Sequence, residues 1–457
     1  MKRSCDGLLL LAIAVAGGAW TRDQLLALGA HRAQWAQDLA FFDQILHSAT
    51  QGGPWTSSLL LEPTGFWSMV HFHPVFALLL PLYALVPGPA TLVAVNAFAV
   101  ASAAWPLARL GDRAGPSFAL CAGVAFLVWI PVQAGAVADF RPMALWVPAL
   151  AWVLHGLTSG RWGPLVFGAA LCCLSREESG YVLPALGAVA AVWPLGGSRR
   201  PGAVLVAIGL AWLGFLLLFK ENLFFHFDPR KLLDGGGGGA SPELVEARVA
   251  YLRQSFLGGW LLAPLAPQPL AMSLAPMGWL WADTHREWHG LTGTYVYLRS
   301  ALLPLFAGAG ILGAARLVRG PRSAVALGLL MVVGNLFAFP AERERFANRR
   351  AAHAEEAGSP EVAAIDGLIA RLHPDDAVAT DYRLIASVSG RAVLWNAVHL
   401  YLDDGQPPHW QGSWPLTVEA VDTLLVPVDD PVLEHASTWS EEARGGGYVL
   451  LRAPVPG

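Results

Sequence analysis

Residues 163–195 read GPLVFGAALCCLSREESGYVLPALGAVAAVWPL, and this stretch contains the pattern that decides the fold. Two apolar runs flank the charged triplet Arg176-Glu177-Glu178. Apolar runs of this kind are typical of helices in a lipid bilayer, although each is shorter than the roughly 20 residues of a full span. The stretch predicts two membrane helices joined by a turn of three charged residues.

Apolar runs recur on both sides of this stretch. They lie at about 7–20, 76–86, 90–108, 117–134, 142–157, 202–219, 251–265, 268–281, 298–315 and 323–339. Prolines inside many of them suit kinked helices buried among other helices, which satisfy the freed backbone groups. The pattern predicts a mainly α-helical, polytopic membrane domain over residues 1–340, with about eleven crossings.

The N-terminus has the form of a signal sequence, because the basic residues Lys2 and Arg3 precede the apolar run 7–20. Later apolar runs already commit the chain to the membrane, so we expect an uncleaved signal anchor. Its basic end is expected to stay in the cytoplasm, which makes residues 21–71 the first external loop.

Four clusters of arginine between the apolar runs orient the remaining helices. They are Arg109 with Arg113, Arg161, Arg199 with Arg200, and Arg316 with Arg319 and Arg322. Placed in the cytoplasm by the positive-inside rule, they leave the chain after residue 340 outside. Residues 72–108 hold two apolar runs where the charges permit one net crossing, so we expect residues 74–86 to be juxtamembrane or re-entrant. The predicted location is the inner (cytoplasmic) membrane.

Charged residues are few and unevenly distributed. The chain has 457 residues, of which 54% are hydrophobic and 14% charged, against about a quarter charged in a typical soluble domain. Residues 341–457 hold 27 of the 64 Asp, Glu, Lys and Arg residues, 18 acidic and 9 basic. No run of like charges is long enough to follow a phosphate backbone, so we expect membrane lipids and no nucleic acid as partners.

The pattern changes after Pro340. Residues 362–372 have the spacing of an amphipathic helix, and four short apolar segments have the composition of buried strands. The segments are 377–380, 392–395, 423–426 and 448–451. Residues 341–457 are therefore predicted to form a small extracytoplasmic α/β domain with a mostly parallel sheet.

Two carboxylates stand out in the first external loop. Asp38 and Asp43 lie in an amphipathic pattern that predicts an interfacial helix ending at Gly52 and Gly53. On a helix the two carboxylates are about 140° apart, so they are not an obvious metal pair. A carboxylate held against an apolar surface has a raised pKa, which suits a general base. An ordinary solvated helix face is the alternative.

Further polar residues lie where the predicted topology places external loops. His71 and His73 precede Pro74, which favours an extended backbone that turns both rings to one face. Such a pair can bind a metal ion or a phosphate, and simple interfacial anchoring is the alternative. Asp139 and Arg141 lie between two apolar runs, where a substrate-binding pair and a local ion pair are equally compatible with the sequence.

Arg176, Glu177 and Glu178 form the fourth external site. Ionisable groups between two nearly continuous apolar runs are costly if they face lipid, and they usually line a functional site. We therefore interpret all three as candidate substrate-binding residues.

These segments together resemble a known family. The motifs are Asp38-Leu-x-x-Phe-Asp43-Gln44, His71-x-His73-Pro74, Pro81-Leu-Tyr83-x-Leu-x-Pro87, Asp139-Phe-x-Pro142, the Glu177-Glu178 turn, the region of Tyr295, His373-Pro374-Asp375-Asp376-Ala377-Val378 and Ser389-Gly390-Arg391. They resemble those of the bacterial and archaeal membrane proteins grouped as domain-of-unknown-function family 2079. The likeness covers most of the chain.

That family is in turn similar to the GT-C superfamily of polytopic glycosyltransferases. The resemblance implies a GT-C-like fold and the transfer of a sugar from a polyprenyl-phosphate donor to an acceptor at the external membrane face. It gives the role of general base to Asp38, with Asp43 second, and a part in metal or acceptor binding to Asp139 or Glu178. The cofactor stays unknown, with a divalent metal ion as one candidate.

Two other classes stay open. A transporter would place paired ionisable residues and broken helices near the membrane midplane, often in repeated halves. Here the charges lie at the predicted external ends of helices and no repeat is visible. A non-enzymatic envelope assembly protein would use the domain after residue 340 as its working part.

Overall fold

The computed structural model describes residues 2–33, 36–53, 55, 57–59, 72–223, 245–246, 249, 256, 260–282, 301–397 and 421–454. His71 lies outside them, as do most of residues 220–246 and 282–296, which the arginine clusters predict to be external loops. The chain divides into two units. Unit 1 comprises Met1–Thr21, Val70–Val75 and Ala94–Phe346, and unit 2 comprises Arg22–Met69, Phe76–Val93 and Ala347–Gly457.

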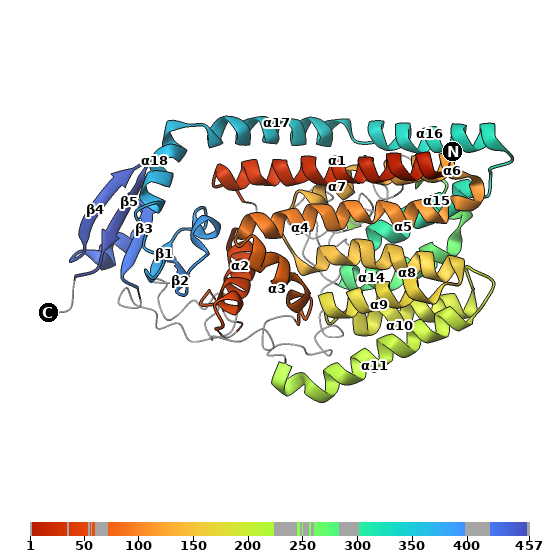
Figure 1. The fold of residues 1–457 in the computed structure, drawn as a ribbon, viewed down its shortest axis with the longest axis horizontal. Coiled ribbons are helices and arrows are strands. Elements are labelled where there is room, and N and C mark those ends of the chain that lie inside the picture. The colour runs from red at the N-terminus through yellow and green to blue at the C-terminus, as the bar shows by residue number, and fades with distance from the viewer. Residues whose placement is uncertain are drawn as a thin grey trace. The chain divides into compact units, whose positions relative to one another are not determined.

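Unit 1 is helical throughout its described part (Figure 1). Its elements are α5 (Ala104–Leu110), η1 (Asp112–Ala114), α6 (Pro116–Leu127), α7 (Ile130–Ala136), η2 (Pro142–Leu145), α8 (Trp146–Ser159), α9 (Trp162–Ser175), α10 (Ser179–Val192), α11 (Arg200–Leu223), η4 (Ala263–Leu265), α14 (Pro267–Ala282), α15 (Leu302–Ala315) and α16 (Pro321–Phe337). Three more helices contribute residues to both units: α1 (Lys2–Gly29), α4 (Pro89–Ser102) and α17 (Pro340–Ala357).

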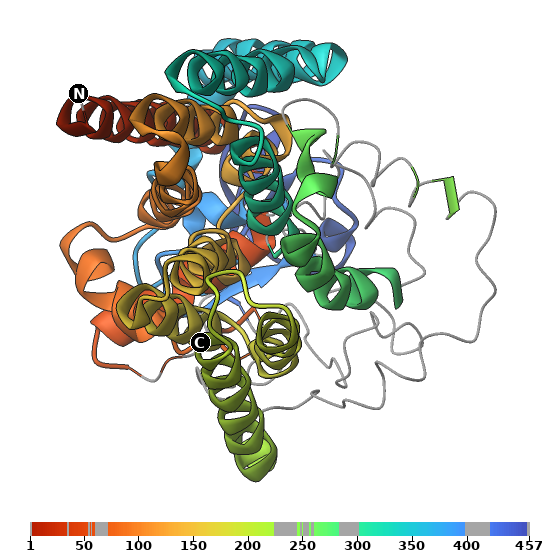
Figure 2. The same ribbon diagram turned by 90° about the vertical axis from the view of Figure 1, so that its right-hand side faces the viewer.

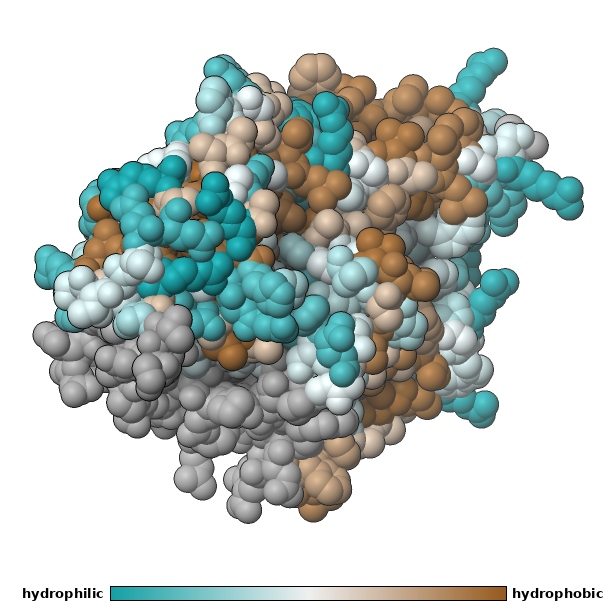
Figure 3. Space-filling model, turned by 60° about the vertical axis from the view of Figure 1, so that its left-hand side comes forward, coloured by the Kyte–Doolittle hydropathy of each residue, from teal (hydrophilic) through white to brown (hydrophobic). Residues whose placement is uncertain are grey.

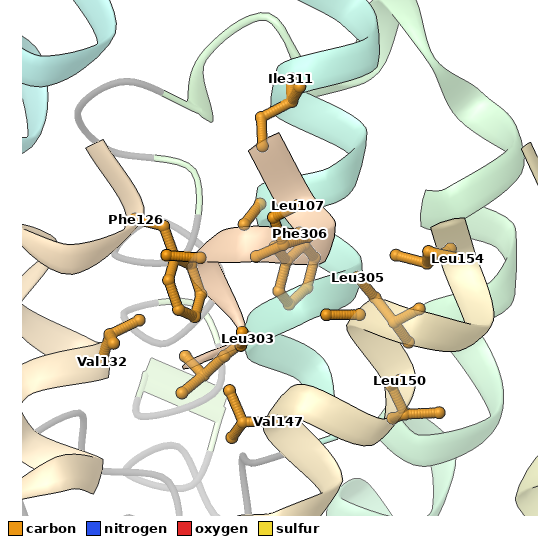
Figure 4. Close-up of a cluster of buried hydrophobic side chains, with 14 of the residues drawn as sticks. Leu107, Phe126, Val132, Val147, Leu150, Leu154, Leu303, Leu305, Phe306 and Ile311 are labelled. Atoms are coloured by element: carbon orange, nitrogen blue, oxygen red, sulfur yellow. The ribbon is translucent and has the colours of Figure 1, made fainter. Parts of the chain in front are cut away.

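The core of unit 1 is a cluster of aliphatic and aromatic side chains to which most of its helices contribute. Figure 4 shows Leu107 of α5, Phe126 of α6, Val132 of α7, Leu150 of α8 and Phe306 of α15 in this cluster, where all five are almost fully buried. Burial of apolar area is the main favourable term in such packing, at about 25 cal/mol per Å².

Large hydrophobic side chains are also exposed on unit 1. Leu11 on α1, Phe167 on α9, Leu218 on α11 and Phe337 on α16 are each more than half exposed. Hydrophobic residues gather in broad areas of the surface in Figure 3. Extended apolar surface of this kind marks contact with a membrane or a partner.

Three helices among the described residues are long and apolar enough to cross a membrane, or up to five if each of two bent helix pairs counts as one span. The three are Lys2–Gly29, Pro89–Leu110 and Arg200–Phe219, and the bent pairs are α6 with α7 and α16 with α17. Helix α3 (Phe76–Leu85) is about 15 Å long, half the thickness of the hydrocarbon core. The count of about eleven crossings stays a prediction.

One end of unit 1 carries its basic turns. Arg109 pairs with Asp6 near the N-terminus (2.6 Å), and Lys2 pairs with Asp112 (3.5 Å). The turns after α5, α8, α10 and α15 lie at this end, on the right in Figure 1 and toward the viewer in Figure 2. The four arginine clusters lie in or beside these turns, so they gather at one end of the unit.

Unit 2 contains a five-stranded sheet with the order β2-β1-β3-β5-β4. Its strands are β1 (Val378–Thr380), β2 (Leu394–Asn396), β3 (Thr423–Pro427), β4 (Ser440–Gly445) and β5 (Tyr448–Arg452). The unit also holds α2 (Ala36–Thr50), α3, α18 (Pro360–Ile369), η7 (Ile385–Val388) and η10 (Pro431–Ala436). Helix α18 begins with Pro360, and the Ser359 hydroxyl accepts the N–H of Val362 as its cap.

The sheet is mixed rather than mostly parallel. The pairs β1–β2 and β1–β3 are parallel, whereas β3–β5 and β4–β5 are antiparallel. The sequence pattern missed β4 because SEEARG is a polar, largely exposed edge strand without apolar alternation. Gly446 and Gly447, with φ of +57° and +75°, close the β4–β5 hairpin in the left-handed conformation that such a turn requires.

The end of unit 1 with the arginine clusters is predicted to face the cytoplasm. Reporter fusions at residues 112, 198 and 320 should therefore read cytoplasmic, because positively charged loops are retained on that side. A fusion at residue 358, after α17, should read external. A paired phosphatase and fluorescent-protein reporter at each position makes the measurement, and an external signal at residue 198 would overturn this orientation.

Candidate active site

Helix α2 carries both carboxylates of the first external loop. It spans Ala36–Thr50 and buries an apolar face that includes Leu39 and Ile45. At its end, Gly52 has a φ of +74°, and the N–H groups of Gly52 and Gly53 donate to the carbonyls of Ala49 and Ser48. This arrangement is the Schellman motif, which needs glycine at the left-handed position. The predicted helix and its glycine turn are confirmed.

Asp38 and Asp43 have different environments on this helix. Asp38 is half-buried, whereas the side chain of Asp43 is fully buried. The two residues are five positions apart and therefore point about 140° apart. One carboxylate is thus enclosed by protein while the other reaches the surface of the unit.

Hydroxyl groups from two distant segments hold Asp43. The Tyr83 hydroxyl on α3 donates to Oδ1 and the Ser389 hydroxyl donates to Oδ2, each at 2.7 Å. Burial raises the pKa of Asp43 to about 6, although both hydrogen bonds act in the opposite direction because they stabilise the ionised form. Both carboxylate oxygens are therefore occupied by protein donors.

Neighbouring amides extend this contact along α2. The Gln44 amide N–H groups donate to the carbonyls of Arg391 (3.0 Å) and Ala392 (3.2 Å), and its oxygen accepts the N–H of Ser58 (2.9 Å). Next to Asp38, the oxygen of Gln37 accepts from the Asn396 amide at 3.2 Å. Residues 389–396 thus contact α2 at both ends of the segment that carries the two carboxylates.

In unit 1, the charged turn between α9 and α10 is buried. Arg176 and Glu178 are 7% and 6% exposed, and the Arg176 Nε–H is 2.8 and 2.7 Å from the two Glu178 carboxylate oxygens. Helices α9 and α10 have 14 residues each, so each is about 21 Å long, shorter than the roughly 30 Å hydrocarbon core. The ion pair balances charges that would otherwise be costly in this apolar surrounding.

The segment 72–75 lies against this turn. The Phe72 N–H donates to Glu177 Oε2 (3.0 Å), and the Val75 N–H donates to the Leu174 carbonyl (2.7 Å). His73 is buried, and its Nδ1 lies 2.7 Å from the Ser175 carbonyl. Because a carbonyl only accepts, Nδ1 carries the proton, and in the neutral ring Nε2 holds the lone pair.

The loop between α7 and η2 reaches the same end of unit 1. Asp139 is buried and Arg141 is half-buried. The buried Asn96 amide holds this loop, because it donates to the carbonyls of residues 135, 136 and 138. The Arg176 guanidinium lies 3.5 Å from the Met143 sulfur, which joins η2 to the charged turn.

The structure thus groups the predicted residues within each unit. His73, Asp139, Arg141, Arg176, Glu177 and Glu178 belong to unit 1, and Asp38 and Asp43 to unit 2. His71 lies outside the described residues. Within the part of the chain that the structure describes, no group of three or more His, Cys, Asp or Glu side chains is arranged to hold a metal ion.

Sequence reasoning assigned no role to Tyr83, Ser389, Gln44 or Asn396. The first three lie inside motifs that carry the family resemblance, so a signal was present. The role of Ser389 depends on its contact with Asp43, which lies 346 residues away in the sequence. No spacing rule predicts such a contact.

These features define a polytopic α-helical membrane protein with a buried polar end and a small α/β region. The fold is of the ArnT-like GT-C type. It is similar to the crystal structure of ArnT from Cupriavidus metallidurans bound to undecaprenyl phosphate, with a TM-score of 0.58 and 16% identity over 97% of this chain and 98% of that one. The apo state of the same protein gives 0.56 and 15% over 98% of each chain.

Residues 35–224 match the family described as "Predicted membrane protein (DUF2079)", which confirms the expected resemblance for the motifs from Asp38 to Glu178; the motifs near Tyr295 and at 373–391 lie outside the matched residues. None of the curated proteins matches the chain by sequence. The GT-C-like fold predicted from that resemblance is also confirmed. The domain boundary at residue 340 and the roles of individual residues stay predictions.

The raised pKa of Asp43 predicts a pH-dependent stability. The folded state binds a proton that the unfolded state releases above its lower pKa, near 3.8. The contribution of Asp43 to the free energy of unfolding is therefore greatest below about pH 4. It is lost as the pH rises through about 6, which lowers the free energy of unfolding by about 3 kcal/mol in total. The melting temperature in detergent should fall between about pH 4 and 6.5, and Asp43→Asn should make this fall smaller.

Asp429→Asn provides the matched control, since Asp429 is an exposed aspartate of the same unit. It should keep the wild-type pH dependence. An unchanged slope in Asp43→Asn would contradict the assignment of the proton to Asp43.

Proposed function

We propose that the protein is an integral membrane glycosyltransferase of GT-C type. It transfers a sugar from a polyprenyl-phosphate donor to an acceptor hydroxyl at the external membrane face, and Asp38 is the general base. His71, His73, Asp139, Arg141, Arg176, Glu177 and Glu178 are the proposed substrate-binding residues.

One observation carries the proposal: the likeness to ArnT extends over 97% of this chain, and that structure holds undecaprenyl phosphate. At 16% identity the likeness concerns the fold, so the substrate class comes to this chain as an inference. The exposed apolar surface of unit 1 is suited to a lipid-linked substrate, whose prenyl chain stays in the bilayer.

The proposed reaction needs a base and a charge-stabilising group. Asp38 takes the proton of the acceptor hydroxyl as its oxygen attacks the anomeric carbon of the sugar. The bond between that carbon and the phosphate oxygen breaks, and the phosphate leaves with the electron pair. Cationic or hydrogen-bond-donating groups stabilise the leaving phosphate, a part that suits Arg141 and Arg176.

The geometry favours Asp38 over Asp43 as the base. A general base must come within hydrogen-bond distance of the acceptor hydroxyl. Asp43 is fully buried and accepts a protein hydroxyl on each oxygen, whereas Asp38 is half-buried. We therefore give the catalytic part to Asp38 and a positioning part to Asp43.

Asp38→Asn should abolish sugar transfer while leaving expression and melting temperature near wild type. The change keeps size and polarity but removes the proton acceptor, and loss of a general base costs about 100- to 10,000-fold in rate. The assay follows release of undecaprenyl phosphate from synthetic undecaprenyl-phosphate sugars, incubated with the purified chain and a membrane extract as acceptor.

Asp429→Asn is the control and should keep wild-type turnover, since Asp429 is exposed in unit 2. Normal turnover of Asp38→Asn with abolished turnover of Asp43→Asn would assign the base to Asp43 instead. If native mass spectrometry detects no undecaprenyl phosphate on the wild-type chain, the transporter or assembly hypothesis takes the place of the enzyme.

A further inference from the structure

Residues 389–396, here called the clamp segment, contact α2 at several points. Ser389 binds Asp43, and the carbonyls of Arg391 and Ala392 accept from Gln44. At the other end, the Asn396 amide donates to Gln37, the residue that precedes Asp38. The contact points span residues 37–44 of α2, about two helical turns.

The loop that follows α2 is tied to the same segment. The Ser58 hydroxyl accepts the N–H of Leu394 (2.8 Å) and lies 2.9 Å from the Leu394 carbonyl, while the Gln44 amide donates to this hydroxyl (2.9 Å). One serine therefore links α2, its loop and strand β2.

The clamp segment is itself held by the sheet and by a buried arginine. Strand β2 pairs in parallel with β1, with Leu394 opposite Val378. Arg391 is 8% exposed, and its guanidinium donates to the carbonyls of Val388 and His373. A segment bonded on both sides in this way has little freedom to shift, so it can define the position of the helix that it contacts.

We propose that the clamp segment is a positioning element for the general base, in which Ser389 and Asn396 hold α2 in the rotation that presents Asp38 to the acceptor. This inference rests on the proposed function, because its effect on the reaction passes through Asp38. Ser389 fixes the buried side of the helix through Asp43, and Asn396 fixes the turn that carries Asp38. The region after residue 340 thereby has a part in the reaction without contributing a group that touches substrate.

Rate is sensitive to such positioning. Reacting atoms must approach to about 3–3.5 Å in line, and a displacement of about 1 Å can cost about 100-fold. A small rotation of a helix about its axis moves a carboxylate on its surface by about this distance. The substrate-binding groups on other segments do not move with it. Loss of a clamp contact should therefore lower kcat and leave KM nearly unchanged.

The experiment compares Ser389→Ala, Asn396→Ala and the exposed Ser437→Ala with wild type. Hydrogen exchange of the α2 amides and the kinetics of undecaprenyl phosphate release are measured on the same full-length preparations in detergent. We expect faster exchange in residues 37–47 and a kcat about 10- to 100-fold lower for the first two variants, with KM within about 3-fold. Ser437→Ala should match wild type, since this serine is exposed and belongs to neither the clamp segment nor α2.

The two clamp variants contact α2 at different points, so one remains informative if the other fails to fold by size-exclusion chromatography. Ser389→Thr keeps the hydroxyl and should recover part of the lost kcat. Wild-type kcat in folded Ser389→Ala and Asn396→Ala would overturn the positioning role, as would an equal loss in kcat and rise in KM. No turnover in the wild type itself would instead overturn the proposed function, and the clamp role with it.

Discussion

A buried carboxylate determines how unit 2 is assembled. Asp43 has no solvent exposure, and an isolated carboxylate in such a place would be strongly destabilising. The hydroxyls of Tyr83 and Ser389 make its burial tolerable, and they come from a short helix after the first loop and from the C-terminal third of the chain. Three segments far apart in sequence must therefore fold together before this group is satisfied.

The same requirement explains why the first loop and the last hundred residues form one unit in the structure. Gln44 needs partners for its amide just as Asp43 does for its carboxylate, and it finds them in the carbonyls of Arg391 and Ala392. The break in composition at Pro340 marks where the apolar runs end, and the unit that holds residues 347–457 also includes residues 22–69 and 76–93. The composition of a segment indicates whether it prefers water or lipid. Its place in a folded unit depends also on the segments with which its buried polar groups form hydrogen bonds.

Local features were accessible from sequence, and distant pairings were not. Helix α2 and its Gly52 end follow from periodicity and from the φ that a glycine permits, and strands β1, β2, β3 and β5 follow from apolar content. Strand β4 does not, because its polar residues lie at an exposed edge. The residues of the candidate site were recognisable as ionisable groups in apolar surroundings, yet the partner of each depends on chain topology, which periodicity does not encode.

The two carboxylates of α2 show why position on a helix matters more than residue type. Both are aspartates within one motif, five residues apart, and sequence alone allows either to be the base. Asp43 has no solvent exposure and accepts a protein hydroxyl on each oxygen at 2.7 Å, so an acceptor hydroxyl can reach it only if the segments around it move apart. Asp38 is half-buried and lies about 140° around the helix from Asp43, so the enclosed side of α2 holds the helix in place while the side that carries Asp38 reaches the surface of the unit.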